Sequence, residues 1–361
     1  MKSGAMVLEE FNKPLIWREI EIPEIPKGGV LVRMVSSGVC GSDVHMWEGK
    51  DPRVPLPIIL GHEGVGEIVY INGEKKDLNG EELKEKDLIT WNRGIVCGKC
   101  FYCKVAKEEY LCPNRKIYGI NRSLKEYPYL SGAYSEYMIL DPETEIIRLP
   151  ENVDPDVAVI AGCSGATAMH AFDEIKETLV GKTVVVQGAG PLGIFALSLA
   201  RFHGAENLLV IAGSVERLEI AKNIGIDVIL NRRETTPEER KRKVMEVTHG
   251  RGADIVIEAT GDSKALLEGI SLLRKGGLYL IVGVATPQES IPLDIYEIAS
   301  KNLTIKGIWV SSGRHVYQAV SFVAKNQNIF ESIITHRLPL REANYALQLM
   351  RERKALKVVL K

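Results

Sequence analysis

Short apolar runs alternate with amphipathic stretches through the second half of the chain. Runs rich in valine and isoleucine occur at 183–187, 208–213, 228–231, 253–260, 277–283 and 303–310. Between most of them, apolar residues recur at intervals of three and four, which predicts helices with one apolar face. One such series is Leu192, Phe195, Leu199 and Phe202. Apolar strands that alternate with helices predict a parallel sheet covered on both faces, and six such strands fit a doubly wound dinucleotide-binding fold.

The first part of the chain, to about residue 155, has a shorter and less regular pattern. Segments 30–36 and 64–71 are predicted strands, and glycine and proline interrupt the pattern around them. The polar segment 72–87 is typical of a surface loop or hairpin. We therefore expect an α/β protein with a β-rich domain over 1–158 and 303–361. A dinucleotide-binding domain is expected over 159–302.

Composition limits the possible partners and location. A chain of 361 residues is longer than one hydrophobic core usually includes, which predicts two domains. With 26% charged and 45% hydrophobic residues, the composition is typical of a globular protein. The net charge of −1, with both signs interspersed, does not favour binding to nucleic acid. No apolar run approaches the roughly 18–20 residues that cross a bilayer, and the first residues lack a signal-peptide pattern. These features predict a cytoplasmic protein without membrane contact.

Four of the six cysteines lie close together in the sequence, at Cys97, Cys100, Cys103 and Cys112. In a reducing compartment, clustered cysteines indicate a metal site more readily than disulfides. Four thiolates can enclose a tetrahedral Zn²⁺ with no open position, which is typical of a structural site. Unrelated buried thiols and an iron–sulfur cluster are the two other interpretations of this spacing.

A second group of metal-binding and acid–base residues is spread over three segments. These residues are Cys40, Ser42, Asp43 and His45 in the first segment, His62 and Glu63 in the second, and Cys163 in the third. Two thiolates and one imidazole would neutralise Zn²⁺ and leave its fourth position for a substrate. Taken singly, each residue is more typical of ordinary packing, so the prediction depends on their occurring together with a dinucleotide motif.

That motif follows the predicted strand at 183–187 and opens a predicted helix. It consists of Gly188, Ala189, Gly190, Pro191, Leu192 and Gly193. The strand before and the helix after it are the context that this glycine pattern requires. The glycines allow the backbone to approach a pyrophosphate at the positive end of the helix.

The chain resembles the zinc-containing medium-chain dehydrogenases over essentially its whole length. The segments GVCGSDVH at 38–45 and GHEGVG at 61–66, the four-cysteine lobe and GAGPLG at 188–193 occur in the order seen in that family. The resemblance implies a GroES-like catalytic domain, a Rossmann domain, and one catalytic and one structural zinc per chain. It also implies reversible hydride transfer between an alcohol and NAD(P), in a homodimer or homotetramer.

The resemblance also implies roles for individual residues. The catalytic zinc ligands would be Cys40, His62 and Cys163, with Glu63 as a carboxylate that can approach the metal. Asp43 would orient His62, Ser42 would hydrogen-bond the alcohol, and His45 would be the outer end of a proton relay. Three further residues would contact the cofactor: Thr167 and Val284 near the nicotinamide, and Lys357 near the pyrophosphate.

The segment after the second predicted strand decides which dinucleotide binds. A carboxylate there would bind the ribose hydroxyls of NAD, but the chain has Ala212 at that position. Gly213 and Ser214 resemble the small pair of NADP-preferring members, and Arg217, Arg232 or Arg233 could approach the 2′-phosphate. If these arginines face solvent, Glu216 is the nearest acid. The pattern favours NADP over NAD.

Two departures from the family affect the interpretation. Eight residues separate Cys103 from Cys112 where seven are usual, which requires a local bulge in the lobe. Arg93 stands where the family often has proline, and a buried arginine there would suit a carboxylate, a phosphate or a polyol, although it could equally face solvent. The sequence thus predicts an alcohol dehydrogenase. A polyol- or inositol-type dehydrogenase and a non-catalytic dinucleotide-binding protein are the alternatives.

Overall fold

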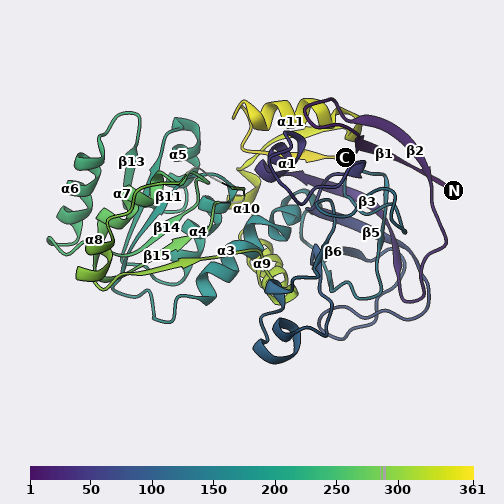
Figure 1. Ribbon diagram of the computed structural model, residues 1–361, viewed down its shortest axis with the longest axis horizontal. Helices are drawn as coiled ribbons and strands as arrows, with labels where there is room; N and C mark the ends of the chain where they lie inside the picture. Colours follow the sequence, from purple (N-terminus) through teal and green to yellow (C-terminus); the bar gives the residue numbers. More distant parts are fainter. Residues whose placement is uncertain (285, 288–289) are drawn as a thin grey trace. The chain divides into compact units, whose positions relative to one another are not determined.

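The computed structural model describes residues 1–284, 286–287 and 290–361. They form two compact units, 1–166 with 310–361, and 167–309 (Figure 1). The predicted domain boundaries lie earlier in the chain, at 158/159 and 302/303. The strand β16 (Thr304–Gly307) pairs with β15 (Leu273–Ile281) inside the second unit, so the chain returns to the first unit only at 310. Residues 159–162 form a short 3₁₀ helix, η3, that packs on strands of the first unit.

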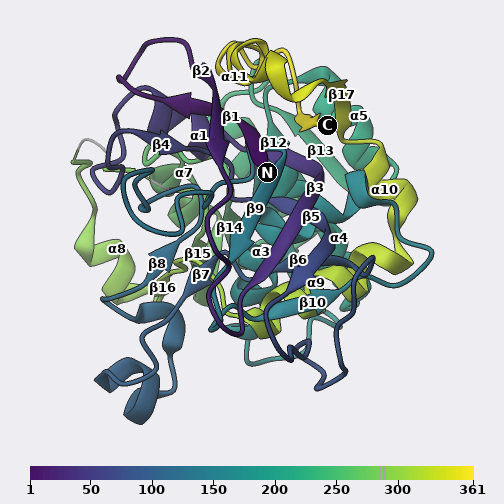
Figure 2. The same ribbon diagram turned by 90° about the vertical axis from the view of Figure 1, so that its right-hand side faces the viewer.

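The first unit is β-rich. Its strands are β1 (Lys2–Leu8), β2 (Ile16–Glu21), β3 (Val30–Val39), β4 (Ile58–Ile59), β5 (Gly64–Ile71), β6 (Leu88–Trp91), β7 (Gly94–Ile95), β8 (Lys116–Ile117), β9 (Tyr137–Leu140), β10 (Ile146–Arg148), β17 (Ile334–Leu338) and β18 (Lys357–Leu360). The main sheet has the order β10-β6-β5-β3-β18-β17, with β9 also paired to β3; Figure 2 shows β3, β5 and β6 side by side. The strand predicted at 64–71 coincides with β5.

Short helices connect these strands. They are α1 (Gly41–Trp47), η1 (Tyr102–Ala106), η2 (Glu109–Leu111), α2 (Pro155–Ala158), η3 (Val159–Gly162), α9 (Gly313–Lys325), α10 (Gln327–Glu331), η4 (Leu340–Glu342) and α11 (Ala343–Arg351). The helix α3 (Ser164–Asp173) crosses the boundary into the second unit.

The central strand β3 separates two apolar cores in the first unit. Successive strand residues point to opposite faces. Accordingly, Leu31 belongs to one buried cluster, whereas Val30 and Val32 belong to the other. This burial on both sides fixes the register of β3, whose end leads directly into α1.

The second unit is a doubly wound α/β fold, as predicted. Its described strands are β11 (Thr183–Gln187), β12 (Asn207–Ala212), β13 (Val228–Asn231), β14 (Ala253–Glu258), β15 and β16, and all their pairings are parallel. The order is β13-β12-β11-β14-β15-β16. The topological switch point therefore lies between β11 and β14, and ligands bind such sheets at the carboxyl ends of these strands.

Helices accompany this sheet (Figure 1). They are α4 (Pro191–Phe202), α5 (Val215–Lys222), α6 (Pro237–Val247), α7 (Ala265–Leu272) and α8 (Ile295–Ser300). The apolar series predicted for α4 is interrupted at its end, because Phe195 and Leu199 are buried whereas Phe202 is 69% exposed. Among the described residues, no helix combines the length and the apolar character needed to span a membrane.

A buried carboxylate ties together distant parts of the first unit. Asp156 on α2 accepts a hydrogen bond from Ser36 Oγ at 2.5 Å and from Arg337 Nε at 2.7 Å, and Lys361 Nζ lies 2.8 Å from its Oδ2. Burial opposes ionisation, but hydrogen bonds from Lys361, Ser36 and Arg337 lower the pKa of Asp156. The ionised carboxylate therefore links α2, β3, β17 and the last residue of the chain.

The substitution Asp156→Asn is expected to lower the free energy of unfolding by about 1–3 kcal/mol at neutral pH, because charge-assisted hydrogen bonds are lost. Because the folded-state pKa is depressed, this contribution is present above the ordinary Asp pKa of about 4 and is lost as the pH falls through the lower folded value. Denaturant unfolding of both proteins at neutral and acid pH measures it. The control Glu331→Gln removes a half-exposed partner of Arg337 and should change little. A difference that is the same at both pH values would contradict the prediction.

Candidate active site and cofactor site

The helix α1 begins at one of the predicted metal ligands. Cys40 is the residue before the first turn, and its backbone N–H donates to Asp43 Oδ2 at 2.8 Å. This bond holds Asp43, which is completely buried, against the start of the helix. Ser42 and His45 follow on the same helix, three residues apart and therefore on the same side.

Three separate chain segments bring the predicted catalytic ligands together. Cys40 starts α1, His62 and Glu63 precede β5, and Cys163 lies between η3 and α3. One ligand atom from each of these four residues lies within 4.8 Å of the others. Thiolates, an imidazole and a carboxylate in this arrangement match the donor set of Zn²⁺. The residues present therefore fit a zinc ion.

The orientation of His62 is fixed from behind by Asp43. His62 Nδ1 lies 3.1 Å from Asp43 Oδ1, and Tyr134 Oη donates to Asp43 Oδ2 at 3.1 Å. The other ring nitrogen, Nε2, is thus left on the side of the ligand set, 3.3 Å from Ser42 Oγ. Burial lowers the pKa of His62, but the Asp43 carboxylate and its hydrogen bond raise it to about 10. A carboxylate behind a histidine is the usual support of a metal ligand.

Glu63 forms a buried ion pair with Lys357. Both side chains are at most 1% exposed, and Lys357 Nζ donates to Glu63 Oε2. The other oxygen, Oε1, is buried without a hydrogen-bond partner. A Cβ on Gly38 would lie 3.1 Å from Lys357 Nζ and closer still to Glu63 Oε2, so glycine at this position of β3 leaves room for the pair. The contact of Lys357 with a pyrophosphate stays a prediction, because the contact observed is with Glu63.

The remaining predicted catalytic residues have no direct link to one another. His45 is partly buried, its Nδ1 lacks a hydrogen-bond partner, and no hydrogen bond in the described structure joins it to Ser42. Burial and repulsion by Lys50 lower the pKa of His45, so the ring is largely neutral at neutral pH. Thr167 is partly buried on α3, in the second unit.

The four-cysteine lobe gathers its thiols despite the extra residue. The sulfur atoms of Cys97, Cys100, Cys103 and Cys112 all lie within 4.8 Å of one another. The segment Tyr102–Ala106 forms a π-helical turn that ends at Lys107 in a left-handed conformation, with φ 57°. A π-turn accommodates one additional residue, which explains how eight residues fit between Cys103 and Cys112. Hydrogen bonds from the N–H groups of Lys99 and Cys100 lower the pKa of Cys97 to about 6. The residues therefore fit a closed tetrahedral zinc site.

The glycine motif of the second unit connects β11 to α4 in the geometry expected for a dinucleotide. Gly188 has φ +109°, and a Cβ on Gly193 would lie 2.0 Å from the Gly188 oxygen, so both positions require glycine. By contrast, no atom lies within 4 Å of the Cβ position of Gly190, at the start of α4. The amino terminus of α4 is therefore open beside Gly190, where a pyrophosphate would bind.

The end of β12 carries the residues that would distinguish the two dinucleotides. Ser214 caps α5, and its hydroxyl donates to Glu216 Oε2 at 2.6 Å. Side-chain atoms of Arg232 lie 3.2 Å from the Cβ position of Gly213, so this exposed arginine extends across Gly213. Arg217 is partly buried and lies on α5, close enough to influence the Glu216 carboxylate.

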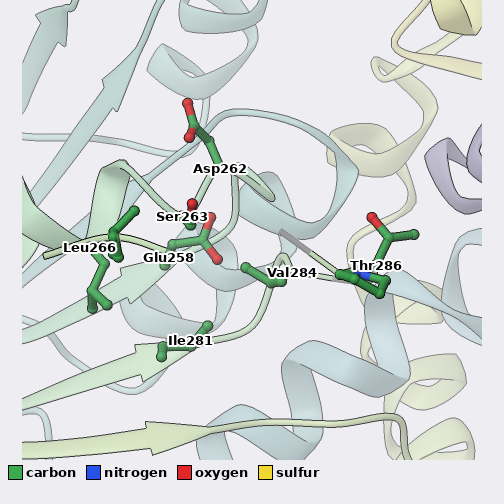
Figure 3. A pocket seen from close by; sticks show the side chains of 9 residues that line it. Glu258, Asp262, Ser263, Leu266, Ile281, Val284 and Thr286 are labelled. Atoms are coloured by element: carbon green, nitrogen blue, oxygen red, sulfur yellow. The ribbon is translucent and has the colours of Figure 1, made fainter. Parts of the chain in front are cut away.

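A cavity of about 340 Å³ lies at the carboxyl ends of β14 and β15. Figure 3 shows Val284, one of the predicted cofactor residues, on its wall together with Leu266 and Ile281. Glu258 lies at its base and is 1% exposed; its carboxylate accepts hydrogen bonds from the N–H groups of Thr260, Gly261 and Gly283. Sequence reasoning did not single out Glu258, although an acid at the end of an apolar strand was a usable signal.

Comparison with known proteins identifies two family models in the chain. Residues 26–151 match the alcohol dehydrogenase GroES-like domain, and residues 191–325 match the zinc-binding dehydrogenase domain. The first match includes seven of the eight residues of the two metal-ligand clusters, and the missing one is Cys163. The second match includes the glycine motif from Pro191 onward.

Similar full-length proteins are known. The chain is 34% identical to 5-exo-hydroxycamphor dehydrogenase of Pseudomonas putida, with 99% of this chain and 98% of that protein covered. It is 30% identical to L-threonine 3-dehydrogenase of Pyrococcus furiosus, with 97% and 95% covered. The crystal structure of an alcohol dehydrogenase from Thermotoga maritima is 60% identical, covers 100% of this chain and 99% of that one, and superimposes with a TM-score of 0.97.

Proposed function

Because this chain belongs to the zinc-containing medium-chain dehydrogenases, and is thus a zinc-dependent oxidoreductase acting on CH–OH groups with a nicotinamide cofactor, we propose that it is an alcohol dehydrogenase with two zinc ions per chain. The observation that carries the proposal is the convergence of Cys40, His62 and Cys163, supported by Asp43. A non-catalytic role would not require this ligand set to be complete.

The reaction follows from the residues around this set. Cys40, His62 and Cys163 would hold zinc, whose Lewis acidity makes the alcohol hydroxyl easier to deprotonate. Ser42 Oγ, beside His62 Nε2, would accept the hydroxyl proton, and His45, on the same helix, would release the proton to solvent. A bound nicotinamide would supply the acceptor for the hydride of the alcohol carbon, so that a carbonyl product, one proton and the reduced cofactor would balance the reaction.

Turnover of a substrate panel tests this proposal. We expect the zinc-loaded protein to oxidise members of a panel of primary and secondary alcohols, cyclic polyols and hydroxy acids, forming one reduced nicotinamide per carbonyl. Activity confined to cyclic polyols would favour the polyol-type alternative, which Cys163 makes less suitable because polyol dehydrogenases commonly have glutamate there. The absence of turnover with every class and with both cofactors would contradict the proposal.

For the cofactor, we propose a preference for NADP, supported by Ala212 in place of an acid and by Arg232 beside Gly213. The substitution Arg232→Ala is expected to raise the Kd for NADPH by about 10-fold and to change the Kd for NADH little, because it removes a charge-assisted bond to the 2′-phosphate. Fluorescence titration of the unaltered protein and of Arg232→Ala with each dinucleotide measures these Kd values. The control Arg242→Ala removes an exposed arginine on α6. If the unaltered protein bound NADH more tightly than NADPH, Arg232 would not bind a 2′-phosphate.

We also propose a homodimer or homotetramer, which the family resemblance suggests. The candidate contact is β16, which lies at one edge of the sheet and so leaves backbone groups available for pairing. The exposed side chains of Ile295 and Tyr296 on the preceding helix, 76% and 79% accessible, add apolar surface to the same region of the chain. A monomer in sedimentation experiments would contradict this assembly.

A further inference from the structure

Two arginine side chains are buried in the first unit without a carboxylate partner. Arg93 is 5% exposed and Arg115 is 8% exposed. Within the part of the chain that the structure describes, neither forms an ion pair. Arg93 donates to the carbonyl oxygen of Gly162 at 2.7 Å, and Arg115 donates to that of Ser311 at 3.1 Å. The Nε atom of each guanidinium is buried and has no hydrogen-bond partner.

The small sheet β7–β8 places these two arginines close together. Arg93 directly precedes β7, and its carbonyl oxygen accepts from the N–H of Tyr118, just beyond β8. Arg115 directly precedes β8 and lies against Gly94, where an added Cβ would be only 1.9 Å from Arg115 Nε. Gly94 is therefore required for the position of Arg115, and the site is built into the backbone of the lobe.

The electrostatics of this pair are unfavourable as they stand. Arg115 is buried, and the charges of Arg93 and Arg53 repel its guanidinium, whereas Glu145 attracts it without forming an ion pair. Arg53 itself is compensated, because its Nη2 lies 2.5 Å from Asp51 Oδ2. Buried cations without a partner lower stability, and proteins usually pair them with an acid. Two adjacent buried guanidiniums, neither of which is in direct contact with a carboxylate among the described residues, thus indicate that an anion from outside the chain completes the site.

The position of Arg93 connects this site to the metal-ligand cluster. Its guanidinium donates a hydrogen bond to the carbonyl oxygen of Gly162, the residue before the predicted ligand Cys163. A small molecule held by its anionic group at Arg93 and Arg115 would therefore have its neighbouring carbon atoms close to the ligand set. By contrast, Arg122, another buried arginine of this unit, is already paired with Asp141 at 2.8 Å.

We propose that Arg93 and Arg115 bind an anionic group, a carboxylate or a phosphate, of the alcohol substrate. The substrate class is then a hydroxy acid, a sugar acid or a phosphorylated alcohol. This inference rests on the proposed function, since the oxidised carbon is the one placed at Cys40, His62 and Cys163. The anionic group itself is unchanged in the reaction.

Matched substrates test the proposal directly. A short 3-hydroxy acid is compared with the amide of the same acid, and the phosphate monoester of a short diol with the free diol. We expect kcat/KM to be at least about 10-fold higher for the charged member of one pair, because charge-assisted hydrogen bonds to two guanidiniums are gained. The pair that shows the difference identifies the anion as carboxylate or phosphate. Equal values within both pairs would overturn the proposal and leave the alcohol dehydrogenase activity intact.

Substitutions locate the effect. In Arg93→Met and Arg115→Met we expect KM for the charged substrate to rise about 10- to 100-fold, with a smaller change in kcat. The ratio of kcat/KM between charged and neutral substrates should fall by a similar factor. The variant Arg93→Lys, which retains the charge, should recover part of the loss. The control Lys116→Met removes an exposed charge next to Arg115 and should leave both constants unchanged.

Binding measurements separate this inference from the proposed function. Calorimetric titration of the Cys40→Ala protein with the 3-hydroxy acid and with the diol phosphate is independent of turnover. Binding that is lost in Arg93→Met, at unchanged thermal stability, would support the anion site even if no alcohol were oxidised. No binding of either anion to a protein that oxidises neutral alcohols would overturn it.

Discussion

Cys40→Ala is expected to lower kcat/KM by at least about 10³-fold and to reduce the zinc content by one ion per chain. Removing one of two thiolates leaves His62 and Cys163 as an incomplete ligand set, together with a carboxylate that Lys357 already neutralises. Loss of the Lewis acid removes several kcal/mol of transition-state stabilisation, and each 1.36 kcal/mol corresponds to about a tenfold change in rate. Steady-state kinetics and metal analysis of the purified variant measure both effects.

The same variant should retain its dinucleotide affinity, because the glycine motif lies in the second unit. Fluorescence titration with NADPH thus separates loss of the metal from loss of the fold. The control His336→Ala removes a partly buried histidine outside both clusters and should keep both zinc ions and full turnover. Wild-type turnover in Cys40→Ala would show that the chemistry does not depend on this ligand set.

The two metal clusters differed in how far the sequence alone could predict them. Cys97, Cys100 and Cys103 lie within seven residues, so the chain's local geometry already limits their separation. The catalytic set draws on three segments, with 123 positions between Cys40 and Cys163, and only the family resemblance joined them before the structure did. The π-turn after Cys100 was expected only as an unspecified bulge.

Periodicity predicted the elements better than their ends. It identified the strands of the parallel sheet and the buried face of α4, but it counted Phe202 as part of that face. Phe202 is the last residue of α4 and is mostly exposed, so it does not belong to the buried face. Similarly, the apolar run at 303–310 was counted with the six strands of the parallel sheet but was placed with 303–361 in the β-rich domain, and its pairing with β15 decides for the sheet.

Contacts between distant residues were beyond sequence reasoning. Tyr134 donates to Asp43 across 91 positions, and Lys357 pairs with Glu63 across 294. The sequence did not predict a role for Arg115, because the proposed role depends on its contact with Gly94 and on its burial beside Arg93. In each case a side chain becomes informative only when its partner, or the lack of one, is known.

Replacing Cys112 by serine is expected to remove the structural zinc and to destabilise the four-cysteine lobe while leaving the catalytic ligand set in place. Cys112 is the most buried of the four thiols, and its Sγ also accepts from the N–H of Cys97 at 3.4 Å. The lobe has few other cohesive contacts, because Phe101 and Val105 are 62% and 68% exposed. A zinc ion bound by the four thiols would therefore supply most of the free energy that orders this segment.

We expect the Cys112→Ser protein to contain one zinc per chain and to unfold at least about 10 °C lower than the wild type, since structural zinc contributes many kcal/mol to folding and each kcal/mol shifts Tm by a few degrees. Calorimetry and metal analysis measure this, and hydrogen exchange should show the loss of protection concentrated between β7 and β8. Initial rates at low temperature should fall far less than in Cys40→Ala, because the two clusters share no ligand.

An unchanged Tm, with two zinc ions retained, would show that serine is an adequate fourth ligand or that the lobe is ordered without metal. If the unaltered protein itself contained a single zinc that Cys40→Ala removed, the four thiols would instead be free cysteines.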